Sequence, residues 1–408
     1  MSEVAQAPQL RFPEFNVSWN EYKLGSITDV VDSLHTTPKD YVSSGFPMIR
    51  VVDVNNIELD LNKCLNVSEE TYRQFTKKYQ PKVGDVVLSR VGTCGASIML
   101  RTKDNVCLGQ NTVLLHPKIN KDFYHILVKS NIFQVQVSRR VVGSTQKTLS
   151  LKDLKLFKLN IPAKPEQQKI AEFLTAVDNK IEQLSKKQAL LGEYKKGLMQ
   201  QIFSQAIRFK ADDGSDFPNW EEKKLGDVVS TPVSDGPHLT PKFVKQGVPF
   251  LSVNNLVESK IDFSNVRYIS IDDHLVFSKK CKPKKGDVLL GKAASVGKVA
   301  FVETDVEFNI WSPIAMIRPG NSNFSKYIYY CFQTRFILNQ ISKFTNSSSQ
   351  GNIGMGDINK IIIKLPNKLE QTKIANLLSS IDSKIEQVGK QLRESKQFKK
   401  ALLQQMFV

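Results

Sequence analysis

The sequence predicts an α/β protein built from two pseudo-symmetric globular units that are joined by two long helices. The first observation is an internal repeat, because the tract Pro165-Glu166-Gln167-Gln168-Lys169-Ile170-Ala171 returns 204 positions later as Glu370-Gln371-Thr372-Lys373-Ile374-Ala375. The second observation is a heptad pattern of apolar residues inside both copies of this tract. The third is a series of short β-branched and aromatic runs before each copy. Two long copies do not form a solenoid and instead indicate pseudo-twofold symmetry.

The repeat divides the chain into four parts. We assign residues 1–162 to the first globular unit, 163–205 to the first long helix, 206–366 to the second unit and 367–408 to the second long helix. The units share a framework, because Trp19 with Leu24-Gly25 reappears as Trp220 with Leu225-Gly226. In the same way Val83-Gly84-Asp85-Val86 reappears as Lys285-Gly286-Asp287-Val288.

Short strands and shorter helices are expected inside each unit. The runs Phe46–Val52 and Val248–Val253 are rich in β-branched and aromatic residues and are bounded by Gly, Pro, Asn or Asp, so they predict strands. Amphipathic helices are expected at Phe123–Arg140 and at Ser325–Lys343. Each unit is therefore α/β or α+β.

The two long helices are expected to form an antiparallel coiled coil. Apolar residues recur in alternating steps of four and three, which is heptad spacing. The predicted seam consists of Ile170, Leu174, Val177, Ile181, Leu184, Leu191, Leu198 and Ile202 in the first helix and Ile374, Leu378, Ile381, Ile385, Val388, Leu392, Leu402 and Met406 in the second. Polar residues occupy the weak positions Gln188, Lys195, Ser395 and Lys399. A helix of about 37 residues spans roughly 55 Å, so paired helices would hold the units at opposite ends and act as a ruler. The alternative is a pair of unrelated core helices.

Composition and charge narrow the class of partner. The chain of 408 residues has a net charge of +17 and a pI near 9.5, with the basic excess spread over both copies. Such a chain most often binds polyanions, although a generally lysine-rich proteome would give the same excess. We expect a cytoplasmic protein, because the sequence has neither a secretory leader nor an apolar run of membrane-spanning length. Its five cysteines are widely spaced and are expected to be buried, reduced thiols.

Three loops recur in kind in both units but differ in sequence. The first loop covers residues 32–39 and 234–242, the second 89–96 and 291–298, and the third 143–147 and 347–351. They carry Ser, Thr, Gln, Lys and Arg, which hydrogen-bond phosphates and base edges. The candidate DNA-binding residues are His35, Thr36, Thr37, Lys39, Arg50, Arg90, Thr93, Thr145, Gln146 and Lys147 in the first unit, and His238, Thr240, Lys242, Lys292, Ser295, Ser348, Ser349 and Gln350 in the second. Loops without any function diverge as freely, so this pattern alone does not decide between the two readings.

Signatures of catalysis are missing from the sequence. The segment Gly291–Lys298 resembles a phosphate-binding loop, but its spacing differs and Val299 follows the lysine where Ser or Thr is needed. No Gly-x-Gly-x-x-Gly follows a predicted strand, and no His or Cys spacing indicates a metal site. The tetrapeptide with which adenine methyltransferases hold a flipped base is also missing. We therefore expect neither a catalytic site nor a metal in this chain.

The whole chain resembles the specificity subunit of type I restriction-modification systems. The matching phrases are Ile161-Pro162 with Glu166–Ala171 and Asp178-x-Lys180-Ile181, repeated as Leu365-Pro366 with Glu370–Ala375 and Asp382-x-Lys384-Ile385. The second copy departs by Thr372 in place of Gln168 and Leu365 in place of Ile161. One such phrase is moderately specific, and two at this spacing are highly specific.

The resemblance implies a non-catalytic protein that determines which DNA sequence a larger complex acts on. In this family each globular unit is a target recognition domain that reads one half of a bipartite, asymmetric DNA sequence. The paired helices set the spacer and dock two methyltransferase subunits, which bind S-adenosylmethionine and methylate adenine at N6. Two restriction subunits add ATP-driven and magnesium-dependent restriction, so this chain itself binds no cofactor. The alternatives are a coiled-coil scaffold without DNA readout and a DNA-cleaving nuclease.

Overall fold

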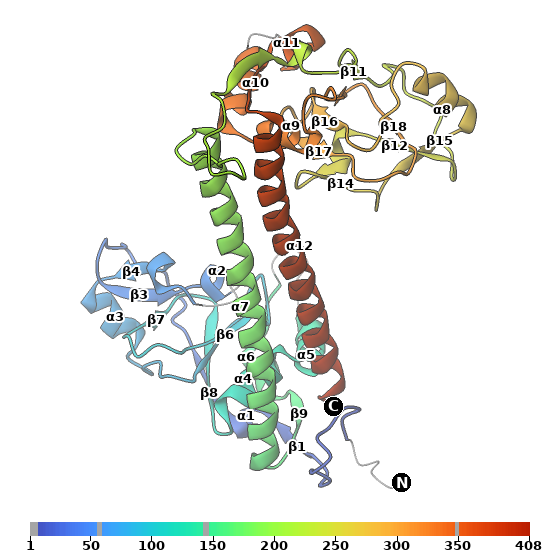
Figure 1. Ribbon diagram of the computed structural model, residues 1–408. Helices are drawn as coiled ribbons and strands as arrows, with labels where there is room; N and C mark the ends of the chain where they lie inside the picture. The colour runs from blue at the N-terminus through green and yellow to red at the C-terminus, as the bar shows by residue number, and fades with distance from the viewer. Residues whose placement is uncertain (1–6, 55–58, 142–146, 347–350) are drawn as a thin grey trace. The chain divides into compact units, whose positions relative to one another are not determined.

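The computed structural model shows two compact units (Figure 1). One unit combines residues 1–186 with 389–408, and the other is formed by residues 187–388, so each long helix contributes one part to each unit. The structure describes residues 7–54, 59–141, 147–346 and 351–408. The predicted α/β class is confirmed, because both units combine several small sheets with helices.

The first unit is built around a four-stranded antiparallel sheet with the order β2-β8-β5-β6. Its strands are β2 (Thr28–Asp32), β8 (Thr112–Pro117), β5 (Val86–Ser89) and β6 (Ser97–Met99). A three-stranded sheet contains β4 (Leu65–Val67), β3 (Phe46–Ile49) and β7 (Cys107–Leu108), and β1 (Asn20–Lys23) pairs with β9 (Lys158–Ile161). The helices are α1 (Leu24–Ile27), α2 (Val51–Val54), η1 (Leu61–Lys63), α3 (Glu69–Phe75), α4 (Lys121–Lys129), α5 (Asn131–Arg140) and α6 (Leu151–Lys155).

The second unit repeats this topology. Its four-stranded sheet has the order β11 (Ser234–Asp235), β19 (Ile314–Ile317), β16 (Val288–Gly291) and β17 (Val299–Phe301). The three-stranded sheet contains β15 (Arg267–Ile269), β12 (Val248–Leu251) and β18 (Asn309–Ile310), while β10 (Glu221–Lys224) pairs with β20 (Ile362–Leu365) and β13 (Leu256–Val257) with β14 (Lys260–Ile261). The helices are η2 (Leu225–Asp227), η3 (Val253–Asn255), α8 (Ile271–Ser278), α9 (Ser325–Cys331), α10 (Arg335–Asn346) and α11 (Met355–Lys360). Equal strand orders in two diverged sequences support the internal repeat.

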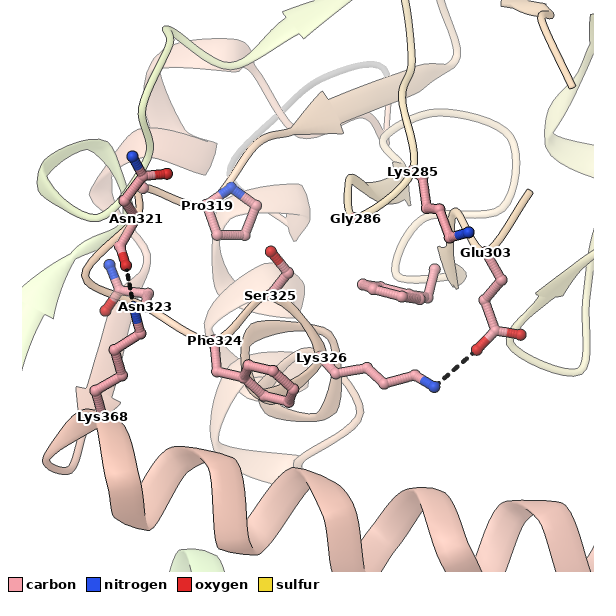
Figure 2. Close-up of a pocket in the computed structure, with 12 residues that line it drawn as sticks. Lys285, Gly286, Glu303, Pro319, Asn321, Asn323, Phe324, Ser325, Lys326 and Lys368 are labelled. Carbon is pink, nitrogen blue, oxygen red and sulfur yellow. Dashed lines mark hydrogen bonds and ion pairs between the residues drawn. The ribbon is translucent and has the colours of Figure 1, made fainter. Parts of the chain in front are cut away.

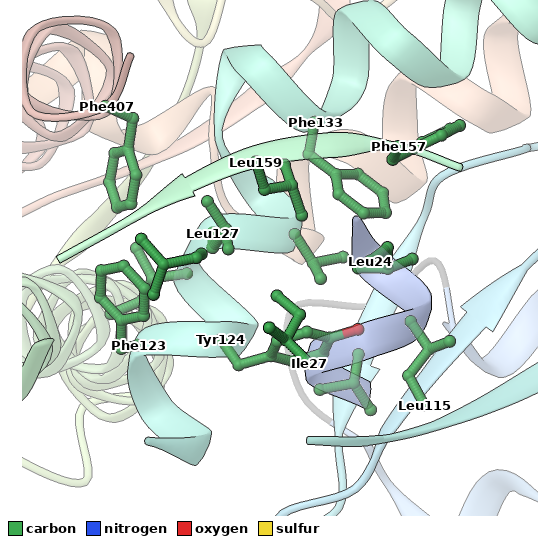
Figure 3. Close-up of a cluster of buried hydrophobic side chains, with 14 of the residues drawn as sticks. Leu24, Ile27, Leu115, Phe123, Tyr124, Leu127, Phe133, Phe157, Leu159 and Phe407 are labelled. Carbon is green, nitrogen blue, oxygen red and sulfur yellow. The ribbon is translucent and has the colours of Figure 1, made fainter. Parts of the chain in front are cut away.

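Apolar side chains explain where the sheet packs in the first unit. All of β5 is buried, as expected for a central strand whose two faces are both covered. Figure 3 shows Leu115 from β8 with Leu24 and Ile27 from α1, and Phe123 and Tyr124 from α4, gathered in one cluster. Helix α1 runs directly into the start of β2 and α4 follows the end of β8, so this packing supports the end of the sheet opposite to the candidate loops, which leave at Asp32 and Ser89.

The long helices are α7 (Lys164–Phe203) and α12 (Lys368–Gln405). They pack antiparallel within each unit. In the first unit, the start of α7 shares a core with the end of α12 through Ile170, Leu174 and Leu402, and Lys399 Nζ donates to Asp178. In the second unit, the end of α7 shares a core with the start of α12, and Lys195 Nζ lies 2.7 Å from Asp382. The predicted antiparallel coiled coil is confirmed.

Burial of the predicted seam follows the heptad pattern. Each apolar seam residue proposed from the sequence is buried or half-buried. The structure also explains why the seam contains the polar residues Lys195 and Lys399, because each of them forms an ion pair with an aspartate of the other helix. A charged residue at a single seam position fixes register at some cost in stability.

The repeated Glu-Gln phrase attaches each long helix to its unit. Glu166 is buried and accepts hydrogen bonds from Arg11 Nε and Nη2, both at 2.7 Å, and from Trp19 Nε1 at 3.2 Å. Glu370 accepts the same set from Arg208, at 3.2 and 2.8 Å, and from Trp220 at 3.1 Å.

The neighbouring glutamines act alike in the two copies. Gln167 donates to Pro162 O and accepts from Asn120 N–H. Gln371 donates to Pro366 O and accepts from the N–H of Phe324. In both copies the phrase therefore acts as a structural clamp between the long helix and its unit.

Both predicted strands differ from the structure at their carboxyl ends. The expected strand Phe46–Val52 is wrong at its end, because α2 begins at Val51 and the Asp53 carboxylate accepts from Arg50 N–H at 2.9 Å. The expected strand Val248–Val253 is wrong at the same place, because β12 ends at Leu251 and η3 begins at Val253, where Asn255 Oδ1 accepts from Ser252 N–H at 3.0 Å. A polar side chain that bonds back in this way starts a helical turn.

The single helices expected at Phe123–Arg140 and Ser325–Lys343 are each broken into two. Ser130 separates α4 from α5 with extended backbone angles, and its hydroxyl bonds back to Leu127 O. In the second unit the break lies between Cys331 and Arg335. Amphipathic periodicity continues across such a break, so the pattern alone does not reveal it.

Candidate nucleic-acid interface

The first and second loops meet at one edge of the four-stranded sheet in the first unit. Strands β2 and β5 flank β8, and both loops start where these strands end, at Asp32 and at Ser89. Asp32 Oδ2 lies 2.9 Å from His35 Nε2, and Asp32 Oδ1 lies 3.5 Å from Arg90 Nε. The latter distance fits an ion pair, but neither atom has a hydrogen-bond partner among the described residues. The contact between the Arg90 side chain and Asp32 is therefore one of charge rather than a directed hydrogen bond.

The described end of the third loop joins the same cluster. Gly92 N–H donates to Lys147 O at 2.9 Å, and Leu149 N–H donates to Arg90 O at 2.8 Å. The thiol of Cys94 lies 3.3 Å from Lys147 O. Backbone bonds between the second and third loops make this a supported surface, and the exposed Lys147 projects from it.

The second unit builds the same arrangement from different residues. Asp235, at the end of β11, lies 3.3 Å from His238 Nε2, 3.0 Å from Lys292 Nζ and 2.6 Å from Lys280 Nζ. Ile353 N–H donates to Lys292 O at 2.9 Å, which ties the second loop to the segment after the third. Burial opposes ionisation of Asp235, but hydrogen bonds from Lys280 and Lys292 hold the pKa of its carboxyl below the usual value.

Exposure separates the candidate residues into two groups. The exposed group consists of His35, Thr36, Thr37, Lys39, Thr93, Lys147, His238, Thr240 and Lys242. Arg90 and Lys292 are only 12% and 14% exposed and face aspartates, and Arg50 at the end of β3 is turned toward Asp53. Ser295 is half-buried. Thr145, Gln146, Ser348, Ser349 and Gln350 lie outside the described residues. A contact of any of these residues with DNA stays a prediction.

Sequence reasoning missed the aspartate at the centre of each cluster, Asp32 in the first unit and Asp235 in the second. Asp32 and Asp235 stand three residues before His35 and His238, so an Asp-x-x-His phrase occurs in both first loops. The rest of these loops diverges. An alignment of the two copies would have shown this shared Asp-x-x-His phrase and would have indicated that the aspartates belong to the site.

The second unit contains one cavity away from the loop cluster and one at it. Figure 2 shows a cavity of about 640 Å³ beside the start of α9, where Lys326 pairs with Glu303 and Lys368 donates to Asn321 O. These lysines are thus already engaged. A second cavity, of about 530 Å³, lies at the loop cluster and is lined by His238 and Lys292.

Neither a metal site nor a membrane span is found in the described parts of the chain. There, His, Cys, Asp and Glu side chains do not gather in any group that could hold a metal ion. Among the described residues, no helix combines the length and the apolar character that crossing a membrane requires.

Comparison with known proteins gives a consistent result. The family model for the type I restriction modification DNA specificity domain matches residues 16–191 and again residues 218–394. The putative type I restriction enzyme MjaX specificity subunit of Methanocaldococcus jannaschii is 25% identical, with 96% of this chain and 93% of the relative covered. The EcoBI specificity subunit of Escherichia coli is 20% identical, with 93% and 82% covered.

Solved structures share the fold. The type I restriction-modification S subunit from M. genitalium superposes with a TM-score of 0.64 at 15% identity, and 99% of each chain is covered. A chain from a study of complex assembly and conformational transition of the type I R-M system gives a TM-score of 0.54 at 17% identity, with 94% of this chain and 96% of that chain covered. The two matched domains span most of the sequence, and the chain therefore belongs to the family of type I restriction-modification specificity subunits, which are non-catalytic DNA-recognition components.

Proposed function

We propose that each globular unit reads one half of a bipartite, asymmetric DNA target and that the chain thereby directs adenine-N6 methylation and restriction by partner subunits. The observation that carries this proposal is the duplicated loop cluster. In both units two loops leave the same end of the four-stranded sheet and are tied together at an aspartate. Two diverged surfaces on one chain suit a target whose halves differ in sequence.

The exposed residues of the clusters have the chemistry that DNA binding requires. Lys39 and Lys242 are exposed at equivalent positions and would contact phosphates, while threonine hydroxyls and imidazoles would contact phosphates or base edges. Readout of three or four base pairs by one unit gives limited discrimination, at about 1 to 3 kcal/mol per base pair. Tying two units together multiplies this discrimination through effective concentration.

We further propose that the paired helices set the spacer and dock the partner subunits. Helices of 40 and 38 residues are long enough to act as a ruler of about 60 Å. The proposed partners are two methyltransferase subunits, which bind S-adenosylmethionine, and two restriction subunits, which use ATP and magnesium. The relatives support this proposal, because they are named as specificity subunits of type I restriction enzymes.

The direct test is a map of adenine methylation in host DNA with and without this gene. We expect one split motif, with two short half-sites around a fixed gap, to lose methylation when the gene is deleted. Restoring the gene on a plasmid should restore the same motif. An unchanged map in a strain that expresses a partner methyltransferase would overturn the proposal and favour a scaffold without DNA readout.

A further inference from the structure

An aspartate, a histidine and a cation form the same constellation in both recognition units. In the first unit Asp32 lies between His35 and Arg90. In the second Asp235 lies between His238 and Lys292 and also pairs with Lys280, whose side chain is 53% exposed. The loop residues between aspartate and histidine are Ser-Leu in one copy and Gly-Pro in the other. The constellation is thus repeated although its connecting residues are not.

The sheet positions the three groups in the same way. The aspartate ends β2 or β11, and the cation follows the last residues of β5 or β16, so the two side chains approach each other across the intervening strand, β8 or β19. The backbone N–H of Arg90 donates to Asn111 O, and that of Lys292 donates to Pro313 O, just before β8 and β19 begin. Each cation is therefore anchored by main chain as well as by charge.

Burial shows which group faces the solvent. Asp32 and Asp235 are 18% and 6% exposed, whereas His35 and His238 are 63% and 70% exposed. His35 Nε2 forms a 2.9 Å hydrogen bond to Asp32 Oδ2, in which the ring nitrogen donates to the carboxylate, and His238 Nε2 lies 3.3 Å from Asp235 Oδ2. In each ring Nε2 faces the aspartate, so Nδ1 is the nitrogen left for a contact with a base edge.

We propose that Asp32 and Asp235 are positioning residues, which hold His35 and His238 so that each imidazole contacts one base pair of the half-site read by its unit. The inference rests on the proposed function and makes it specific to one contact per unit. The carboxylate has two effects. It fixes the ring tautomer and orientation, and it neutralises the buried cation beside the ring, which would otherwise attract phosphate regardless of sequence.

The experiment uses the full chain assembled with its methyltransferase partner and a panel of DNA targets in which every base pair of both half-sites is replaced in turn. Variants His35→Ala, Asp32→Asn and the double variant are compared for methylation rate and for binding to nontarget DNA. Asp29→Asn is the matched control, because Asp29 also lies on β2 but pairs with the exposed Lys118. The set His238→Ala and Asp235→Asn repeats the test in the second unit.

We expect His35→Ala and Asp32→Asn to reduce discrimination roughly tenfold at the same single base pair of one half-site. The double variant should equal the single ones, since both changes remove the same contact. Discrimination in the other half-site should not change, and Asp32→Asn should not weaken binding to nontarget DNA. A merely structural aspartate would instead lower discrimination at every position of its half-site.

Three outcomes are decisive. Additive effects, or effects at different base pairs, would overturn the proposal. Because the histidines are exposed, His35→Ala and His238→Ala should fold even if an aspartate variant does not, and unchanged discrimination in both would also overturn it. If the unaltered complex itself shows no base dependence in either half-site, the proposed function fails rather than this inference.

Discussion

Removal of the buried carboxylate of Glu370 should strongly destabilise the second unit. Glu370 is 0% exposed and is the acceptor for two guanidinium nitrogens of Arg208 and for the indole of Trp220. The variant Glu370→Ala leaves the arginine charge without a partner and the indole N–H unbonded. Loss of one partner of a buried ion pair costs about 3 to 5 kcal/mol.

The structure argues for the lower part of this range. Arg208 is 24% exposed and keeps hydrogen bonds to Phe217 O and Pro218 O, so water and main chain offset part of the loss. We therefore expect a decrease of about 3 kcal/mol in the free energy of unfolding. Glu166→Ala should cost as much or more, because Arg11 is only 13% exposed.

Urea unfolding followed by circular dichroism measures this decrease. The matched control is Glu69→Ala, which removes an Arg–Glu pair of the same chemistry whose side chains are 75% and 63% exposed, and which should cost below about 0.5 kcal/mol. Fluorescence of Trp220 adds a local probe, because its indole loses a hydrogen bond in the variant. A decrease below about 1 kcal/mol for Glu370→Ala would refute the assignment of the Glu-Gln phrase as a structural clamp.

Three further predictions follow from other parts of the structure. The double variant Lys39→Ala and Lys242→Ala should weaken binding to all DNA sequences alike, and it should reduce the slope of log affinity against log salt concentration by about 2. An unchanged slope in a salt titration would contradict contact of these lysines with phosphates. Burial raises the pKa of the Cys281 thiol to about 11 and that of the Cys107 thiol to about 12. At pH 8 both thiols should therefore stay protonated and should not react with an aromatic disulfide, while the half-buried Cys94 reacts first. Equal reaction rates for all thiols would argue against the described packing. Insertion of one heptad into both α7 and α12 should lengthen the gap between half-sites by up to about three base pairs, because seven residues add roughly 10 Å of helix. An unchanged gap in the methylated motif would show that the helices do not set the spacer.

The long helices could be predicted from the sequence because their signal is repeated and periodic. Heptad spacing identified α7 and α12 and their shared seam, and the repeat at an offset of 204 residues identified the pairing. The reason for Lys195 at the seam was not accessible, since its partner Asp382 is brought near only by antiparallel packing.

Element ends inside the units were harder to predict because local side-chain bonds override periodicity. Asp53 turns the chain into α2 after Ile49, and Ser130 interrupts a helix that hydrophobic spacing would continue. These are single polar contacts, and similar residues occur elsewhere in the chain without such effects.

The candidate site was predicted at the level of loops but not of contacts. The loops containing Arg90 and Lys292 do converge with the first loops, yet both cations are drawn to aspartates that were not among the candidates. Pairing of this kind depends on the order of strands in the sheet, which a sequence pattern does not specify. Their exposure therefore makes His35, His238 and the exposed lysines better candidates for DNA contact than Arg90 and Lys292.

The central claim is that each unit alone determines one half of the DNA target. The most direct measurement is the methylated motif produced when residues 206–366 are exchanged for the corresponding unit of a relative with a different target, with the first unit and both helices kept. We predict that one half-site changes completely while the other half-site and the gap remain the same. Changes in both half-sites, or in neither, would contradict the account.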